Sequence, residues 1–438
     1  MLLAHGLGGR SDLPIPLELA LYGCAMAVLI SFAALGLLWP RPRLRGDEAG
    51  RPVPAGVERL LDSRYLRGAL RLLTLAITVL VVAVGLVGPD QTAANLAPYA
   101  VYIVFWCGLV AFSLLLGPVW RVVNPLRAVH RALSRAAGTD AAEGLRELPE
   151  RVGYWPAAAS LAVFVWLELV PEWRADPLVV GAFLVGYATV HVVAAQLYGE
   201  RWFDRGDGFE AYSSLVGRLA PLGRRTDGRL VVRNPLDGLD GLPRSPGLVA
   251  VVAVLVGSTA FDGVTRTRYW QDNVAPDSLV WGTLGLAALV AIVAGTFVLA
   301  ARLAARYGGA TGGTAAEMPQ AFAHSVVPIA VGYAIAHYFS LLLFDGQQAL
   351  ILAADPFQTG ADWLGTADNG ISYDLVSTAT IAYVQVAAIV IGHIVGVIAA
   401  HDRAVRLFPA RTAARSQYPL LVVMVTYTVS GVALLLGA

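Results

Sequence analysis

Titratable and hydroxyl side chains recur inside stretches of this sequence that are otherwise apolar and long enough to cross a membrane. Such groups cost free energy in the hydrocarbon core of a bilayer, so they usually mark a function. They form two sets that differ in their expected depth. The outer set comprises Glu168, Asp262, Tyr333, His337, Ser340 and Asp345, and the inner set comprises Tyr187, His191, Gln385 and His393.

The spacing within each set places several of these side chains on one helix face. Tyr187 and His191 are four residues apart, as are Tyr333 and His337, and residues at this spacing lie above one another on a helix. We expect Glu168 and His337 to face the interior of a helix bundle within reach of a shared ligand, water or ion. Two polar layers at different depths are what a pathway for a small polar solute or ion requires.

Histidines at matching depth also suggest a redox or metal site. His191 and His393 are expected at similar depth on two helices and could ligate a haem iron axially. Together with His337 they are candidate ligands of a transition metal. The chain has no H-x-H, H-E-x-x-H or C-x-x-C motif, so separate helices would have to assemble such a site. His324 and His401 fall at the ends of apolar stretches, where we expect them to be solvated.

Other chemistries lack their motifs. There is no G-x-S-x-G motif of a serine hydrolase. All 32 basic residues are arginine, which excludes a Walker A motif because that motif requires lysine. A net charge of +1 without a basic block argues against a nucleic-acid partner. The two cysteines, Cys24 and Cys107, lie in apolar stretches and are expected to be core residues.

The elements that must position these residues are membrane helices. The chain has 438 residues, of which 57% are hydrophobic and 14% charged, and its mean hydropathy is +0.62. A membrane helix needs about 20 mostly apolar residues. We therefore predict an all-α, polytopic helix bundle that forms a single membrane domain over residues 1–438. The ten expected spans cover residues 17–39, 68–88, 98–118, 155–172, 177–198, 247–264, 278–301, 319–343, 376–400 and 417–437.

The arginines predict the orientation of these spans. Alternate loops carry 28 of the 32 arginines, and cytoplasmic loops carry the excess of positive charge. Both termini are therefore expected outside, in a multi-pass protein of the plasma (inner) membrane. Residues 1–16 lack the features of a signal peptide and are expected to form an outer arm.

Two long cytoplasmic loops, residues 119–153 and 199–246, share an Asn-Pro-Leu sequence that begins at Asn124 and at Asn234. Asparagine before proline is a typical helix start. We expect the helix after Asn124 to lie in the membrane surface. Its apolar face would carry Leu126, Val129 and Leu133, and its solvated face would carry Arg127, Arg131 and Arg135.

Residues 345–374 form the longest outer segment, which carries acidic residues and Trp363 but no base. Its apolar stretch from Ala349 to Ala354 ends at Asp355-Pro356 and is too short to cross a membrane. We predict a re-entrant or interfacial segment over the outer mouth of the bundle.

Three stretches of the chain carry a family resemblance. They are residues 5–16 (HGLGGRSDLPIP), 257–263 (GSTAFDG) and 401–421, which runs from HDRA to SQYPLL. The chain resembles, over its whole length, a family of actinobacterial multi-pass membrane proteins known as fenitrothion hydrolases. The resemblance implies cleavage of an organophosphate triester, and it assigns no catalytic residue.

These observations favour an integral membrane protein, in contact with the lipid bilayer, that transports or senses a small polar solute or ion. Two alternatives stay open. One is a membrane-embedded metal or haem redox protein, or a subunit of one, that uses His191, His337 and His393. The other is a membrane hydrolase of organophosphate esters, and partner subunits or a homo-oligomer are compatible with all three.

Overall fold

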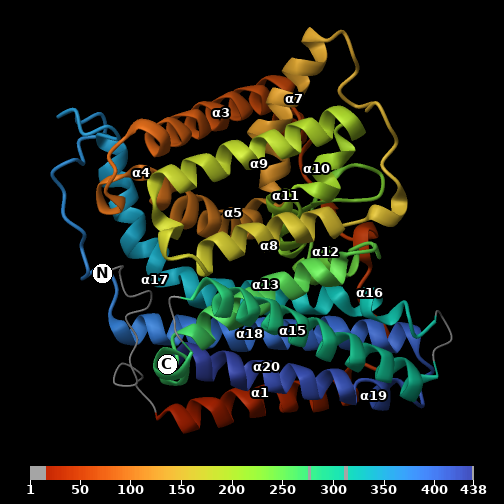
Figure 1. The fold of residues 1–438 in the computed structure, drawn as a ribbon. Coiled ribbons are helices and arrows are strands. Elements are labelled where there is room, and N and C mark those ends of the chain that lie inside the picture. Colours follow the sequence, from red (N-terminus) through yellow and green to blue (C-terminus); the bar gives the residue numbers. More distant parts are fainter. Residues whose placement is uncertain (1–15, 275–277, 310–313, 437–438) are drawn as a thin grey trace. The chain divides into compact units, whose positions relative to one another are not determined.

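The computed structural model describes residues 16–274, 278–309 and 314–436, and it is all-α apart from one small sheet (Figure 1). Within these residues ten helices are long and apolar enough to cross a membrane, as predicted. The expected outer arm falls almost wholly outside the described residues. The ten candidate spans are Leu17–Leu38, Ala55–Val87, Leu96–Leu116, Glu150–Leu169, Pro177–Tyr198, Leu248–Thr265, Leu279–Gly308, Met318–Ala354, Thr378–Leu407 and Tyr418–Leu435.

The contacts divide the chain into two compact units where the sequence predicted one membrane domain. Unit 1 contains residues 1–49, 233–340 and 374–438, and unit 2 contains residues 50–232 and 341–373. Each unit is described by itself.

Unit 2 is built on four spans. Helix α3 (Arg64–Val87) packs on α9 (Pro177–Tyr198), and two glycines let their backbones approach: a Cβ on Gly85 would lie 2.9 Å from the carbonyl oxygen of Pro177. The third span is irregular, because a π-helix (Tyr99–Cys107) joins α4 (Leu96–Pro98) to α5 (Gly108–Leu116). The fourth span contains α8 (Trp155–Leu169).

Short elements connect the spans of unit 2. Three antiparallel strands lie in the order β1-β3-β2, with Val232 opposite both Arg51 and Leu222. The strands are β1 (Arg51–Pro52), β2 (Leu222–Arg224) and β3 (Leu230–Val232), and the short helices are α2 (Ala55–Leu61), α6 (Val119–Val123), α7 (Pro125–Ala136), α10 (Arg201–Gly206) and α11 (Gly208–Val216).

Unit 1 contains the remaining spans and the first half of α17. Helix α13 packs on α15, and α1 packs on α18 and α20. The long helices are α1 (Leu17–Leu38), α13 (Leu248–Thr265), α15 (Leu279–Gly308), α17 (Val327–Ala354), α18 (Thr378–Leu407) and α20 (Tyr418–Leu436). The short helices are α12 (Pro235–Asp240), α14 (Arg268–Asn273), α16 (Met318–Phe322) and α19 (Ala413–Ser416).

A group of charges, buried except for Arg406, joins α1, α12 and α18 in unit 1, and we call it the clamp: Asp402, Asp240, Arg403 and Arg406. The carboxylate of Asp402 accepts hydrogen bonds from Trp39 Nε1 at 2.9 Å and from Arg406 Nη2 at 3.1 Å. The carboxylate of Asp240 accepts hydrogen bonds from Arg403 and Arg406, each at 3.0 Å.

The expectation that His324 and His401 are solvated is wrong, because both are buried in unit 1. The ring nitrogens of His401 lie 3.0 Å from Gln417 Oε1 and 3.0 Å from the carbonyl oxygen of Trp39. His324 Nε2 lies 3.3 Å from the carbonyl oxygen of Ala399. Both residues therefore tie α18 to its neighbours.

The segment predicted from residue 345 onward begins differently in the structure. Residues 345–354 are the last turns of α17, so the stretch from Ala349 to Ala354 extends a membrane helix. The helix ends where Asp355 accepts hydrogen bonds from the amides of Thr359 and Gly360, at 2.9 and 2.7 Å. The apolar sequence continues the helix because nothing breaks its pattern before Asp355-Pro356.

Candidate functional site

Helices α10 and α11 form a hairpin that folds back between the spans of unit 2. The chain reverses after α9 at Gly199, whose φ of 71° favours glycine. Asp207 separates the two short helices and caps α11, because its Oδ1 accepts hydrogen bonds from the amides of Phe209 and Glu210 at 3.0 and 3.2 Å. The capping carboxylate fixes the start of α11 at the tip of the hairpin.

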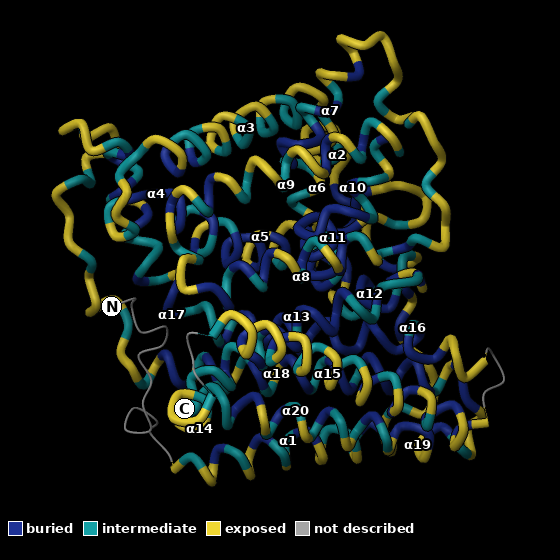
Figure 2. The backbone as a smooth tube through the Cα atoms, viewed as in Figure 1, coloured by how far each residue is buried: buried dark blue, intermediate teal, exposed yellow. Residues whose placement is uncertain are grey.

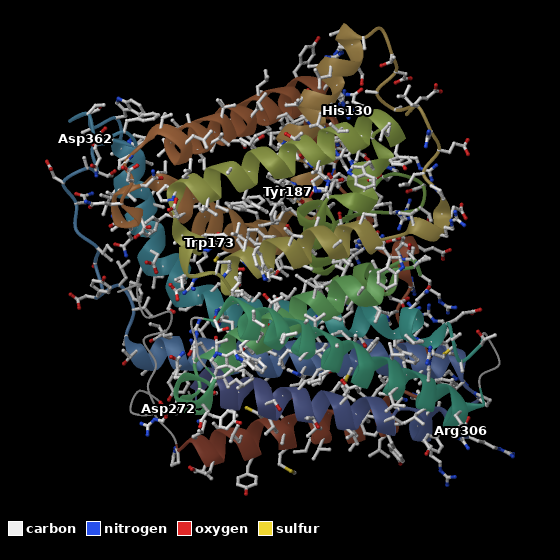
Figure 3. The ribbon with its side chains drawn as sticks, viewed as in Figure 1. His130, Trp173, Tyr187, Asp272, Arg306 and Asp362 are labelled. Carbon is white, nitrogen blue, oxygen red and sulfur yellow. The ribbon has the colours of Figure 1, made fainter. Side chains whose placement is uncertain are left out.

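The tip of the hairpin reaches the level of the middle of the spans. The ring of Phe209 packs against Phe105, Phe164 and Tyr187, with centroid distances of 4.8, 4.9 and 4.9 Å. Phe105 and Tyr187 each lie about halfway along their spans, and Figure 3 labels Tyr187 near the middle of α9. The hairpin is therefore re-entrant, and such backbone is tolerated at membrane depth where protein surrounds it. Figure 2 shows α11 as buried along most of its length.

The carboxylate of Asp207 is fully buried and receives five hydrogen bonds. In addition to the two amides, Tyr187 Oη donates to Oδ1 at 2.6 Å, and Asn124 Nδ2 and Trp120 Nε1 donate to Oδ2 at 2.8 and 3.3 Å. All five donors are neutral. In the part of the chain that the structure describes, no arginine forms an ion pair with this carboxylate.

Glu210, one turn into α11, has a charged partner. Arg127 binds it with two hydrogen bonds, Nε to Oε2 at 2.9 Å and Nη2 to Oε1 at 2.5 Å. Asn124 Nδ2 also donates to Glu210 at 3.0 Å, so one amide bridges both acids of the hairpin. Asn124 caps α7 by accepting from the amide of Leu126 at 3.0 Å. The starts of α7 and α11 thus meet through their capping side chains.

The sequence predicted Arg127 on the solvated face of α7 and Leu133 on its apolar face. The structure shows the reverse for these two residues, because Arg127 is 4% exposed and Leu133 is 47% exposed. The reason is the acidic hairpin, because Arg127 also contacts Asp204 at 3.0 Å and Glu200 at 3.4 Å. The ion pairs offset the desolvation of the guanidinium group. The prediction of a helix starting after Asn124 is confirmed.

These residues form a connected series that we call the acid–base ladder: Glu200, Asp204, Arg127, Glu210 and Asp207. Its first two acids have side chains that are 23% and 33% exposed, and its last two are buried. Arg131 also binds Glu200, and Arg121 Nη2 lies 3.1 Å from Asp204. The ladder therefore leads from the solvated end of unit 2 to the middle of the spans.

The protein environment shifts the proton affinities along the acid–base ladder. Burial raises the pKa of Glu200, but its hydrogen bond and charge interaction with Arg131 outweigh this and hold the pKa below its usual value. Burial raises the pKa of Asp204. Burial, and then the charge of Glu210, raise the pKa of Asp207 to about 6. Asp207, the deepest acid of the ladder, thus has a pKa near neutrality.

Aromatic side chains close the other side of Asp207, and we call them the aromatic plug: Phe105, Trp106, Phe164, Phe183 and Phe209. Trp106 and Phe183 pack on Phe164 with centroid distances of 4.8 and 5.9 Å. Phe183 lies one turn from Tyr187 toward the Pro177 end of α9, away from Glu200. The aromatic plug thus extends from the hairpin tip toward the Pro177 end of α9.

The inner set of predicted residues is divided between the units. Tyr187 binds Asp207, and His191 lies beside it, with ring centroids 4.2 Å apart and Trp202 Nε1 donating to His191 Nδ1 at 3.0 Å. Gln385 and His393 are buried in unit 1. His393 Nδ1 lies 2.8 Å from the carbonyl oxygen of Ile389.

In the outer set, unit 1 brings Asp262 and His337 together. His337 Nε2 lies 2.8 Å from Asp262 Oδ2, and Arg266 Nη2 lies 2.7 Å from the same oxygen. Tyr333 stacks on His337 at 6.1 Å, and Ser340 is buried on the same helix. Glu168 and Asp345 belong to unit 2, so the shared site of Glu168 and His337 stays a prediction.

The described residues hold no group of three or more His, Cys, Asp or Glu side chains that could bind a metal ion. Among the histidines that the structure describes, none hydrogen-bonds to a serine, threonine or cysteine side chain.

Asp207 and Glu210 were not predicted from the sequence, and Arg127 was predicted on a solvated face, because all three lie between apolar stretches. One signal could have found them: Asp207-Gly208 is a helix-capping pair followed by the apolar Phe209. No family model, no curated protein and no solved structure matches this chain.

Proposed function

We propose that the protein transports protons, alone or coupled to a small solute, across the membrane and that Asp207 is the residue that binds the proton. The observation that carries this proposal is the acid–base ladder, which connects solvated acids to a fully buried carboxylate at the level of the middle of the spans. A buried acid without a cationic partner favours the neutral, protonated form. Ionisable groups at membrane depth commonly belong to ion pathways or proton relays.

The donors around Asp207 favour a proton over a metal cation. All five groups that contact the carboxylate present N–H or O–H hydrogens. A hard cation requires several oxygen ligands, whereas these donors would repel it. A proton needs only one acceptor beside the carboxyl group.

Tyr187 supplies that acceptor. Its hydroxyl donates to the ionised carboxylate at 2.6 Å, and a hydroxyl can also accept a hydrogen bond after it rotates. When Asp207 is protonated, its O–H donates to Tyr187 Oη, so the proton stays inside the network. Tyr187 is therefore a positioning residue for the proton on Asp207.

The aromatic plug gives the pathway a closed side. Five packed aromatic side chains adjoin the hairpin tip, and Phe183 extends them toward the Pro177 end of α9, so we infer that they limit proton movement on this side. Transport then requires this barrier to open while the ladder side closes. We infer that protons reach Asp207 from the ladder side in this conformation.

The test is proton flux into liposomes that contain the purified full chain and an internal pH-sensitive dye. We expect wild-type protein to carry protons down a pH gradient, Asp207→Asn to lose at least nine-tenths of the flux, and Asp227→Asn to retain it. Asp227 is a matched control because it is exposed and paired with Arg225. Tyr187→Phe preserves the ring packing and should reduce the flux without loss of folded protein.

Two results contradict the proposal. One is the absence of proton flux in the wild type, with and without candidate solutes. The other is flux that Asp207→Asn leaves unchanged. Turnover of a phosphotriester by the wild type would favour the hydrolase that the family resemblance implies, and a Soret band would favour the haem alternative.

A further inference from the structure

Unit 1 contains an apolar groove of about 690 Å³ between α15 and α20. This volume is within the usual range for ligand sites, about 300–1,000 Å³. The groove is lined on one side by Thr296, Leu299 and Leu303 of α15 and on the other by Val422 of α20. Leu299 and Val422 are 58% and 64% exposed, so the groove opens outward along two candidate membrane helices.

The length of the groove matches one leaflet of a bilayer. From Thr296 to Tyr307 the helix rises by about 16 Å, which is about half of the hydrocarbon thickness. Thr296 Oγ1 and Tyr427 Oη, 2.6 Å apart, join α15 to α20 at the deep end. A single acyl chain would therefore fill the groove from the surface to this contact.

The shallow end of the groove has the features of a membrane interface. Tyr307 and Tyr418 line it, both more than half exposed, and tyrosines concentrate at the level of lipid headgroups. Arg415 lines the same end. Arg302 and Arg306 lie in the last two turns of α15, and Figure 3 labels Arg306 at the end of that helix.

The structure pairs none of these three arginines with an acid among the residues it describes. All three are exposed, and in the described ranges no carboxylate lies within ion-pair distance of Arg302, Arg306 or Arg415. In the clamp and in the acid–base ladder, by contrast, arginines are paired with carboxylates. Uncompensated positive charge at the end of a groove exposed to lipid attracts an anionic headgroup.

We propose that this groove is a binding site for an anionic glycerophospholipid, with one acyl chain between α15 and α20 and its phosphate at Arg415. The occupant is a lipid because the groove runs along membrane helices and ends at the interface. The charge of the arginines selects an anionic headgroup over a zwitterionic one.

Native mass spectrometry of the full chain in detergent tests the site. The protein is mixed with equal amounts of a phosphatidylglycerol and a phosphatidylcholine that carry the same acyl chains, and the bound lipids are counted. We expect the wild type to retain phosphatidylglycerol in preference, and Arg415→Gln to lower that preference about fivefold, the effect of one basic residue near an anionic surface. Arg151→Gln, at an exposed arginine of unit 2, should leave the preference unchanged.

A second variant tests the contribution of the apolar groove separately from that of the arginine charge. Val422→Trp fills the groove at an exposed position and should reduce the binding of both lipids, while size-exclusion chromatography reports whether the protein stays folded. Equal retention of the two lipids by the wild type would overturn the proposal. An unchanged preference in Arg415→Gln, or unchanged binding in Val422→Trp, would overturn it as well.

Discussion

Asp207 in unit 2 and Asp402 in unit 1 are both fully buried, yet their surroundings differ in charge. Asp402 has a cationic partner, Arg406, as well as Trp39 Nε1 and the amide of Arg43 at 2.6 Å. Asp207 has five neutral donors and a second acid, Glu210, bridged to it by Asn124. Burial alone therefore does not distinguish a structural carboxylate from one that can gain and lose a proton, whereas the charge of its neighbours does.

The hydrogen bonds of the clamp and of Asp207 also differ in whether they let the carboxylate take up a proton. The clamp ties its carboxylates to guanidinium groups, which cannot lose their protons and so keep the acids ionised. The hydroxyl of Tyr187 can both donate and accept, so Asp207 keeps a partner in either protonation state. This contrast between Asp207 and the clamp acids supports the proposal that Asp207 is the proton-binding residue.

The largest effect is expected at Arg127. Arg127→Gln removes the positive charge that compensates Glu210, and it also removes the ion pairs of Arg127 with Asp204 and Glu200. Removing one partner of a buried ion pair destabilises a protein by about 3–5 kcal/mol. Thermal unfolding of the purified variant in detergent measures the loss, and Arg225→Gln, at a pair that is largely exposed, serves as the control. A loss below about 1 kcal/mol would show that the ladder is more solvated than its burial indicates.

A smaller effect concerns the pH dependence of stability. Burial raises the pKa of Asp207 from 3.8 to about 6, so between these values the folded chain binds more protons than the unfolded chain. The contribution of Asp207 is therefore present below about pH 4 and declines as the pH rises through about 6, by on the order of 2–3 kcal/mol.

The measurement is the free energy of unfolding of the wild type minus that of Asp207→Asn at a series of pH values. We expect this difference to fall as the pH rises through that window. A difference that increases with pH would mean that the five donors hold Asp207 ionised, as in a structural carboxylate.

Asp402→Asn is expected to have the smallest effect, and only on stability. The substitution weakens hydrogen bonds to a charged acceptor, which are worth about 1.5–3 kcal/mol, but Arg406 keeps its contact with Asp240. Proton flux per folded molecule should equal that of the wild type. Loss of flux in this variant, at unchanged folded amount, would remove the functional distinction between the two regions.

The ten spans could be predicted because each is a long apolar stretch. In a membrane such a stretch forms a helix, which satisfies all its backbone hydrogen bonds internally. The helix of the eighth span continues beyond its predicted end at residue 343, because the end of a helix depends on local capping such as that at Asp355. The pairing of His337 with Asp262 joins two helices that are distant in sequence, and spacing alone could not select this acid over Glu168.

The acid–base ladder was inaccessible to sequence reasoning because the prediction assigned arginines between spans to a solvated surface. Arg127 is buried only because the hairpin brings Glu200, Asp204 and Glu210 to it, and that requires the reversal at Gly199. Among the polar residues expected within spans, Tyr187 binds Asp207 of this network, and it was found because it lies within a span.

The most direct test of the account is whether Asp207 takes up a proton in the folded protein. Infrared difference spectra of the full chain in lipid, recorded as the pH is varied, report the C=O stretch of a protonated carboxyl group. The account predicts a carboxyl band that titrates near pH 6, that is absent in Asp207→Asn and that persists in Asp402→Asn. A spectrum in which Asp207→Asn removes no titrating band would contradict it.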